Sequence, residues 1–132
     1  MKSLDNIKVY GDLTFRGDCP TESVEMSTFF NQLPKHLKRI AVHVRNEGVR
    51  TASQAAKQRA EGGWVKGAAD IIIPGNPCLV IEMKRQDPTK SRVSKEQKEY
   101  LSACQANGAM VCIAYGWEAA MEAVREWQKE TQ

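Results

Sequence analysis

Two acidic residues and a lysine lie within two short apolar segments in the middle of the chain. In GAADIIIPGNPCLVIEMKRQ, residues 67–86, Asp70 precedes three isoleucines, and Glu82 and Lys84 lie within LVIEMK. Charged side chains are seldom buried in a strand unless they are paired or bind a metal ion. Carboxylate oxygens are ligands that Mg²⁺ and Mn²⁺ prefer, and such an ion lowers the pKa of bound water and neutralises phosphate charge. A metal site for phosphate chemistry is therefore one reading of these residues.

The two segments are expected to form a β-hairpin that brings the charges together. Residues 70–73 and 78–84 flank Pro-Gly-Asn-Pro, which is typical of a turn. Because side chains alternate along a strand, Glu82 and Lys84 share one face about 6–7 Å apart. Asp70 joins that face if the loop has an odd number of residues or if a bulge intervenes. The alternative is an ordinary ion pair between Glu82 and Lys84, with Asp70 capping a strand end.

The neighbouring segments predict a mixed α/β protein. Thr21 is placed to cap a helix in which Met26, Phe29 and Leu33 recur at helical spacing, and Pro34 ends that helix or begins a second short one. Ser94 and Gln97 have the spacing of a capping box. Further strands are expected at 39–46 and 109–116, and further helices at 51–61 and 117–130. The order of these elements predicts a central sheet with helices on its faces.

Length and composition describe one ordinary domain. The chain has 132 residues, of which 42% are hydrophobic and 27% charged. We expect a single domain, with residues 1–19 as a loose lead-in or edge strand. The four cysteines have no CxxC spacing, so reduced thiols of a cytoplasmic protein are expected, with no membrane span and no signal peptide. A net charge of +3 permits a polyanionic partner without requiring one.

The longer pattern resembles a known nuclease family. Gly-x-x-Asp at 67–70, a strand pair, Glu-x-Lys at 82–84 and Ser-x-x-Gln at 94–97 resemble the VRR-NUC family of the PD-(D/E)XK nuclease superfamily. The segment from 67 to 124 carries most of the likeness. PTESVEMSTFF and HVRNEG extend it upstream, so that it covers residues 20–125. One departure is Ala69, where the family usually has Pro; that Pro shapes the backbone and binds no metal.

The resemblance implies a role for each residue of the motif. Asp70 and Glu82 would be ligands of Mg²⁺, for which Mn²⁺ would substitute, and the carbonyl of Met83 would reach the same ion. Lys84 would be the catalytic lysine. Gln97 would be an active-site residue near the phosphate or the attacking water. The fold implied is a PD-(D/E)XK-like mixed central β-sheet flanked by helices.

The first helix should supply a further acid. Glu22 and Glu25 lie three residues apart and so share a helix face. The register of the two phenylalanines that follow favours Glu22, which would then be a further metal ligand, but Glu25 stays a candidate catalytic acid. The other reading, for whichever acid is not catalytic, is a first-turn Glu that complements the helix dipole.

Basic residues follow the motif on one side and precede it on the other. Two such groups beside a phosphate-cleaving site are expected to contact DNA, although each residue alone could simply face solvent. The expected DNA-binding residues are Arg45, Asn46, Arg50, Lys57, Arg85, Lys90 and Arg92.

The expected function is structure-specific cleavage of DNA. Stand-alone members of the family resemble homodimeric Holliday-junction resolvases of viral or mobile-element origin, and a two-fold axis suits paired incisions in a four-way junction. The candidate dimer surfaces are the N-terminal segment and the Phe29/Phe30 helix, because adjacent Phe residues point about 100° apart. A monomeric nicking or flap endonuclease and a catalytically inactive DNA-binding module are the alternatives. No organic cofactor is expected.

Overall fold

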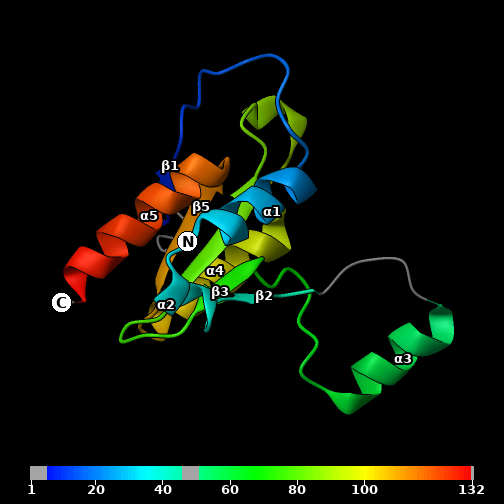
Figure 1. Ribbon diagram of the computed structural model, residues 1–132. Coiled ribbons are helices and arrows are strands. Elements are labelled where there is room, and N and C mark those ends of the chain that lie inside the picture. Colours follow the sequence, from blue (N-terminus) through cyan, green and yellow to red (C-terminus); the bar gives the residue numbers. More distant parts are fainter. Residues whose placement is uncertain (1–5, 46–50, 132) are drawn as a thin grey trace.

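The computed structural model describes residues 6–45 and 51–131, which contain a five-stranded sheet with helices on both faces (Figure 1). The strands are β1 (Lys8–Tyr10), β2 (Val42–His43), β3 (Ile71–Ile73), β4 (Leu79–Lys84) and β5 (Met110–Tyr115). Their order across the sheet is β1-β5-β4-β3-β2. β5 is parallel to both β1 and β4, whereas β3 is antiparallel to β4 and β2. The prediction of a mixed central sheet is confirmed, and the lead-in contributes an edge strand.

Two helices cover one face of the sheet and a third covers the other. α1 (Glu22–Gln32) and α5 (Trp117–Glu130) pack on the face formed by Leu79, Ile81 and Met83. α4 (Lys95–Ala106) packs on the opposite face, where its Leu101 joins Val80. Alternate residues of β4 thus enter two separate apolar cores. The charged residues of β4 share the α4 side with Val80 because the side chains alternate.

The remaining helices are short or lie apart from the sheet. α2 (Lys35–Lys38) follows Pro34, as expected, and η2 (Pro88–Lys90) is a single 3₁₀ turn after β4. α3 (Ala52–Glu61) has no buried residue and projects away from the other elements (Figure 1). Its polar, Ala-rich sequence gives it no apolar face to bury, so its position outside the core follows from its composition.

Local capping signals were read correctly from the sequence. The Thr21 hydroxyl accepts a hydrogen bond from the Val24 amide at the start of α1. Ser94 and Gln97 form both hydrogen bonds of a capping box at the start of α4. Each bond satisfies a backbone donor that the first turn of a helix leaves without a partner.

The hairpin has the register that the site requires. Ile71 lies opposite Ile81 and Ile73 lies opposite Leu79, so residues 74–78 form the loop. Five is an odd number, and continuing the register by one residue places Asp70 opposite Glu82. The prediction that the two carboxylates share a face is therefore confirmed.

The strand predicted at 39–46 is much shorter than expected. Only Val42 and His43 are in β2, because the amides of Ile40 and Ala41 still donate to the carbonyl of Leu37. Those hydrogen bonds prolong the turn of α2 through the first part of the segment. Asn46, at its end, lies outside the described residues.

The cysteines are all free thiols. Cys112 is buried in β5, and Cys19, Cys78 and Cys104 are partly buried. Among residues 6–45 and 51–131, no helix is long and apolar enough to cross a membrane.

Candidate functional site

The site is built around Glu82, a carboxylate in the middle strand of the sheet. The residue is 1% exposed. One oxygen, Oε2, accepts a hydrogen bond from Gln97 Nε2 at 2.8 Å and lies 3.4 Å from Lys84 Nζ. The other oxygen, Oε1, is buried and receives no hydrogen bond from any described residue. A buried acceptor without a donor is costly, so this oxygen is the most informative atom of the site.

Asp70 lies at the entrance to β3, beside Glu82. Its Oδ2 accepts a hydrogen bond from the backbone amide of Met83 at 2.9 Å, which holds the carboxylate against the neighbouring strand. Burial and then the charge of Asp70 raise the pKa of Glu82 from 4.5 to about 9, and Lys84 opposes that shift. The two acids therefore resist being ionised together.

This arrangement fits a hard divalent cation. A cation beside Asp70 and Glu82 would offset their repulsion and would give Oε1 the partner that the protein does not supply. Mg²⁺ commonly binds through one or two carboxylates and keeps several waters. Across residues 6–45 and 51–131, no cluster of three or more His, Cys, Asp or Glu side chains is placed to hold a metal. The fit therefore rests on two protein carboxylates, with water and substrate completing the shell.

Lys84 is buried and held by the start of α4. Its Nζ donates to the carbonyl oxygen of Arg92 at 2.7 Å and to Gln97 Oε1 at 3.1 Å. Two acceptors and the nearby Glu82 carboxylate keep the ammonium group partnered although it is only 4% exposed. The sequence assigned Lys84 to the site, and the structure places it there in a fixed orientation.

Gln97 has two tasks at once. Its Oε1 accepts from the Ser94 amide at 2.8 Å, which completes the capping box of α4, and from Lys84. Its Nε2 donates to Glu82. The sequence predicted an active-site residue near the phosphate or the water. The structure places the Gln97 amide between Glu82 and Lys84, where it positions both, and the predicted role near the phosphate or the water stays a prediction.

A close backbone contact sets the distance between α4 and the segment that carries Asp70 into β3. Gly67 has a φ of +83°, and a Cβ there would lie 2.5 Å from the carbonyl carbon of Glu96 and 2.8 Å from the Gln97 nitrogen. Only glycine fits both the conformation and the space. The sequence motif Gly-x-x-Asp thus has a physical meaning, because Gly67 lets the first turn of α4 approach the entrance to β3.

The two acids of α1 have different surroundings. Glu25 is 0% exposed; its Oε1 accepts from the Trp117 amide at 2.9 Å, and its Oε2 accepts from Gln86 Nε2 at 3.0 Å. It therefore caps the start of α5, whose N-cap Gly116 has no side chain to do so. The geometry gives Glu25 this structural task, and its predicted catalytic role stays a prediction.

Glu22 and Asp70 line the same cleft. We call this the α1–β2 cleft; its volume is about 760 Å³, and it is lined by Glu22, Ser23, Met26, Ser27, Phe30, Asn31, His43, Val44, Arg45 and Asp70. Glu22 is thus the acid of α1 on the side of the site, as its register suggested. No cluster of three ligands includes it among the described residues, so direct metal ligation by Glu22 stays a prediction. The role predicted for the Met83 carbonyl also stays a prediction.

The predicted DNA-binding residues divide into three groups. Arg45, Lys57, Lys90 and Arg92 are exposed, and Arg45 also lines the α1–β2 cleft. Arg85 forms hydrogen bonds within the protein: its guanidinium donates to the carbonyls of Pro20 at 2.9 Å and Cys19 at 2.8 Å. Arg50, like Asn46, lies outside the described residues.

Sequence reasoning missed Asp87, which organises the loop after the motif. Its carboxylate accepts hydrogen bonds from the Thr89 amide at 2.9 Å, the Thr89 hydroxyl at 2.7 Å and the Gly17 amide at 3.0 Å. These hydrogen bonds, those with Thr89 foremost, lower the pKa of Asp87 to about 2. The signal was available, since Asp-Pro-Thr is a typical start for a turn closed by an Asp side chain. The loop that presents Lys90 and Arg92 is thereby anchored to the lead-in.

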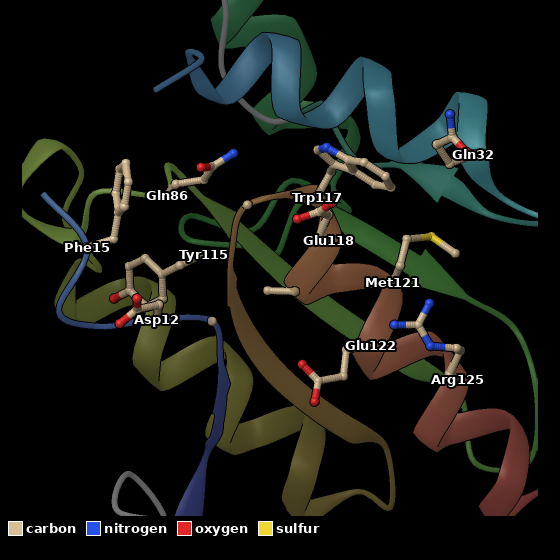
Figure 2. Close-up of a pocket in the computed structure, with 13 residues that line it drawn as sticks. Asp12, Phe15, Gln32, Gln86, Tyr115, Trp117, Glu118, Met121, Glu122 and Arg125 are labelled. Carbon is tan, nitrogen blue, oxygen red and sulfur yellow. The ribbon is translucent and has the colours of Figure 1, made fainter. Parts of the chain in front are cut away.

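A second cleft of about 760 Å³ lies at the start of α5 and is acidic (Figure 2). Figure 2 shows Glu118, Glu122 and Arg125 on α5, with Asp12 on the lead-in. Three carboxylates against one guanidinium among the labelled side chains would repel a polyanion. The two clefts have the same volume, and Asp70 lines the α1–β2 cleft, so the position of Asp70 distinguishes them as sites for DNA.

Comparison with known proteins identifies the fold. A solved structure described as a VRR_NUC domain protein superposes on this chain with a TM-score of 0.68 and 22% sequence identity, covering 87% of this chain and 92% of that one. No protein-family model matches the chain, and the search of curated proteins gave no significant match. An identity of 22% establishes fold and not activity. The chain therefore has the fold of a VRR_NUC domain protein, the mixed-sheet fold that its sequence predicted.

Proposed function

We propose that this protein is a metal-dependent endonuclease that hydrolyses phosphodiester bonds in DNA. The observation that carries the proposal is the buried Oε1 of Glu82, which lacks a hydrogen-bond donor among the described residues and lies beside a second carboxylate. A fold shared with a VRR_NUC domain protein supports the same conclusion. Asp70 and Glu82 would bind Mg²⁺, with Mn²⁺ as a substitute.

The bound ion would supply charge neutralisation for the phosphate and a water of lowered pKa. The protein contributes orientation and electrostatics. Asp70 is held by the Met83 amide, and Gln97 fixes Glu82 and Lys84 relative to each other. Lys84 Nζ lies 3.4 Å from Glu82 Oε2, and it would stabilise negative charge that develops on a phosphate bound beside the pair. Because these groups are fixed before substrate arrives, little reorganisation is needed.

Exposed cations on either side of the site would guide the DNA. Lys90 and Arg92 lie on the loop after β4, Arg45 lies at the α1–β2 cleft, and Lys57 lies on the projecting α3. Replacing both Lys90 and Arg92 by Ala should weaken binding to every DNA and flatten the slope of log K against log salt by up to about two units. The double variant of Lys35 and Lys38, on α2, is the control. An unchanged slope would mean that Lys90 and Arg92 only face solvent.

Holliday-junction resolution by a homodimer is the finer proposal. The structure changes which surface is suitable for the dimer. Phe29 is 0% exposed, and Phe30 is half-buried with its ring centroid 6.0 Å from that of His43, so the Phe pair offers too little apolar surface for a second copy of the chain. Val9 and Leu13 of the N-terminal segment are 42% and 50% exposed. That segment is the dimer surface we now favour.

Cleavage of a panel of DNAs tests the function. Junction, flap, nicked and fully paired DNAs are incubated with Mg²⁺, with Mn²⁺ and with EDTA. We expect incision with either metal and none with EDTA, and Asp70→Asn should abolish incision while DNA binding persists. Wild-type cleavage by Asp70→Asn would remove this residue from the site. A monomer on junction DNA by light scattering would favour the nicking or flap endonuclease over the resolvase.

A further inference from the structure

The α1–β2 cleft has a floor of aromatic and apolar side chains. Phe30 and His43 lie with their ring planes at 33° to each other, and Met26 beside them is 7% exposed. Burial, and then the charge of Arg45, lower the pKa of His43, which favours the uncharged form of its ring. A flat, uncharged ring system is a surface on which a nucleobase can stack.

The rim of the same cleft is polar and regularly spaced. Ser23, Ser27 and Asn31 follow one another at intervals of four residues along α1, so they lie on one face of the helix. Hydroxyl and amide groups of this kind form hydrogen bonds with sugar and phosphate oxygens. Arg45 adds a positive charge at the β2 side.

Asp70 joins this cleft to the site. It is the residue that both lines the cleft and shares the face of Glu82. A nucleotide whose base occupies the cleft would therefore have its phosphate beside Asp70 and the Glu82–Lys84 pair. The volume of about 760 Å³ is within the ~300–1,000 Å³ of clefts that bury small molecules.

This geometry determines whether the bound DNA base is paired or unpaired. In a paired duplex each base is stacked on its neighbours and faces its partner, so it cannot reach a protein ring at the cleft floor. Only an unpaired base, or one rotated out of the helix, can do so.

We propose that the α1–β2 cleft binds one unpaired nucleotide of the DNA strand to be cut, directly beside the scissile phosphate, with its base on Phe30. This inference rests on the proposed nuclease function and adds the substrate class, namely DNA with an unpaired nucleotide at the cut. Stacking requires no particular base, so cleavage depends on the presence of a base and not on its identity.

An abasic substrate tests the contact. The cut is first mapped on a forked DNA that the protein cleaves with Mg²⁺. The nucleotide on each side of the cut is then replaced, one at a time, by an abasic residue. We expect at least about a fivefold loss of cleavage rate at one of these two positions, since stacking of one base on an aromatic side chain has an effect of that size.

Two variants of α1 identify the protein partner. Phe30→Ala should cleave the intact fork more slowly than wild type by the same factor as the abasic substitution, and its cleavage rate should fall no further on the abasic fork. Because Phe30 also packs against Phe29 at 5.4 Å, its thermal unfolding is checked. Ser27→Leu keeps the core and fills the cleft, so it should show the loss even if Phe30→Ala unfolds. Gln32→Ala is the control, since Gln32 is on the same helix but lines the acidic cleft.

The outcomes separate the inference from the function it rests on. Full-rate cleavage of both abasic forks, or losses from Phe30→Ala and the abasic residue that multiply, would overturn the cleft proposal while leaving a nuclease. Equal rates on forked and fully paired DNA would do the same. If no DNA is cut under any condition, the proposed nuclease function is refuted and the inference with it.

Discussion

Asp70→Asn should make the metal-free protein more stable at alkaline pH, although it destroys the proposed site. The raised pKa of Glu82 means that the folded chain holds a proton which the unfolded chain has released. Glu82 therefore favours folding fully below pH 4.5, and this contribution is lost as the pH rises toward about 9. Between pH 5 and 8 the whole shift corresponds to a loss of about 4 kcal/mol as an upper limit.

Burial causes most of that loss, and the charge of Asp70 is the second cause. The substitution removes only the second part, because the amide oxygen of the new side chain would still accept a hydrogen bond from the Met83 amide. We expect a gain of about 1–2 kcal/mol at pH 8, or roughly 3–8 °C in melting temperature for a chain of this size. At pH 5 the gain should nearly vanish.

The assay is thermal unfolding at pH 5 and pH 8, in EDTA and in Mg²⁺. Wild type should be stabilised by Mg²⁺ at pH 8, because an ion that binds only the folded state shifts the equilibrium toward it. Asp70→Asn should lose this response, and Asp18→Asn, which changes an exposed acid in the lead-in, should behave as wild type. The reasoning is refuted if Asp70→Asn melts below wild type at pH 8 in EDTA and still responds to Mg²⁺.

Three further variants test how the site is positioned. Gln97→Ala should lower the free energy of unfolding by ~1 kcal/mol through loss of the capping box, and should also lower the cleavage rate of the folded protein at least about tenfold. Gln54→Ala removes the same kind of capping box from α3 and should show the stability cost alone. Gly67→Ala should impair folding and cleavage far more than Gly63→Ala, because both have φ near +80° but only the first would press on α4; equal effects would exclude the contact as the cause. Glu25→Gln should lower stability by about 1–3 kcal/mol and leave the cleavage rate of the folded fraction unchanged, and loss of that rate would restore its predicted catalytic role.

Features that depend on neighbouring residues were predictable from the sequence. The caps at Thr21 and Ser94 and the alternation of LVIEMK are local. The side-chain period required an odd-length loop or a bulge to align Asp70 with Glu82, and the structure shows that the loop has five residues. The length of the strand at 39–46 was overestimated because β-branched residues also fit the turn after α2. There the carbonyl of Leu37 accepts hydrogen bonds from the amides of Ile40 and Ala41. The β-propensity of a residue describes how well its side chain suits a pleated, half-buried surface. It does not determine which carbonyl oxygen accepts a hydrogen bond from its backbone amide.

The tasks of individual polar groups were not predictable, because they depend on contacts between segments far apart in the chain. Glu22 and Glu25 are both glutamates on nearly the same face of α1. Glu25 nevertheless accepts a hydrogen bond from the start of α5, whereas Glu22 lines the α1–β2 cleft. The α5 N-cap is Gly116, so its first amide needs an acceptor from another element, and Glu25 supplies it at 2.9 Å. Because Glu25 caps α5 and Glu22 lines the cleft with Asp70, we expect Glu22 to be the acid of α1 that serves the site. A sequence pattern can thus identify both acids as candidates, and the packing of α1 on α5 gives them different surroundings.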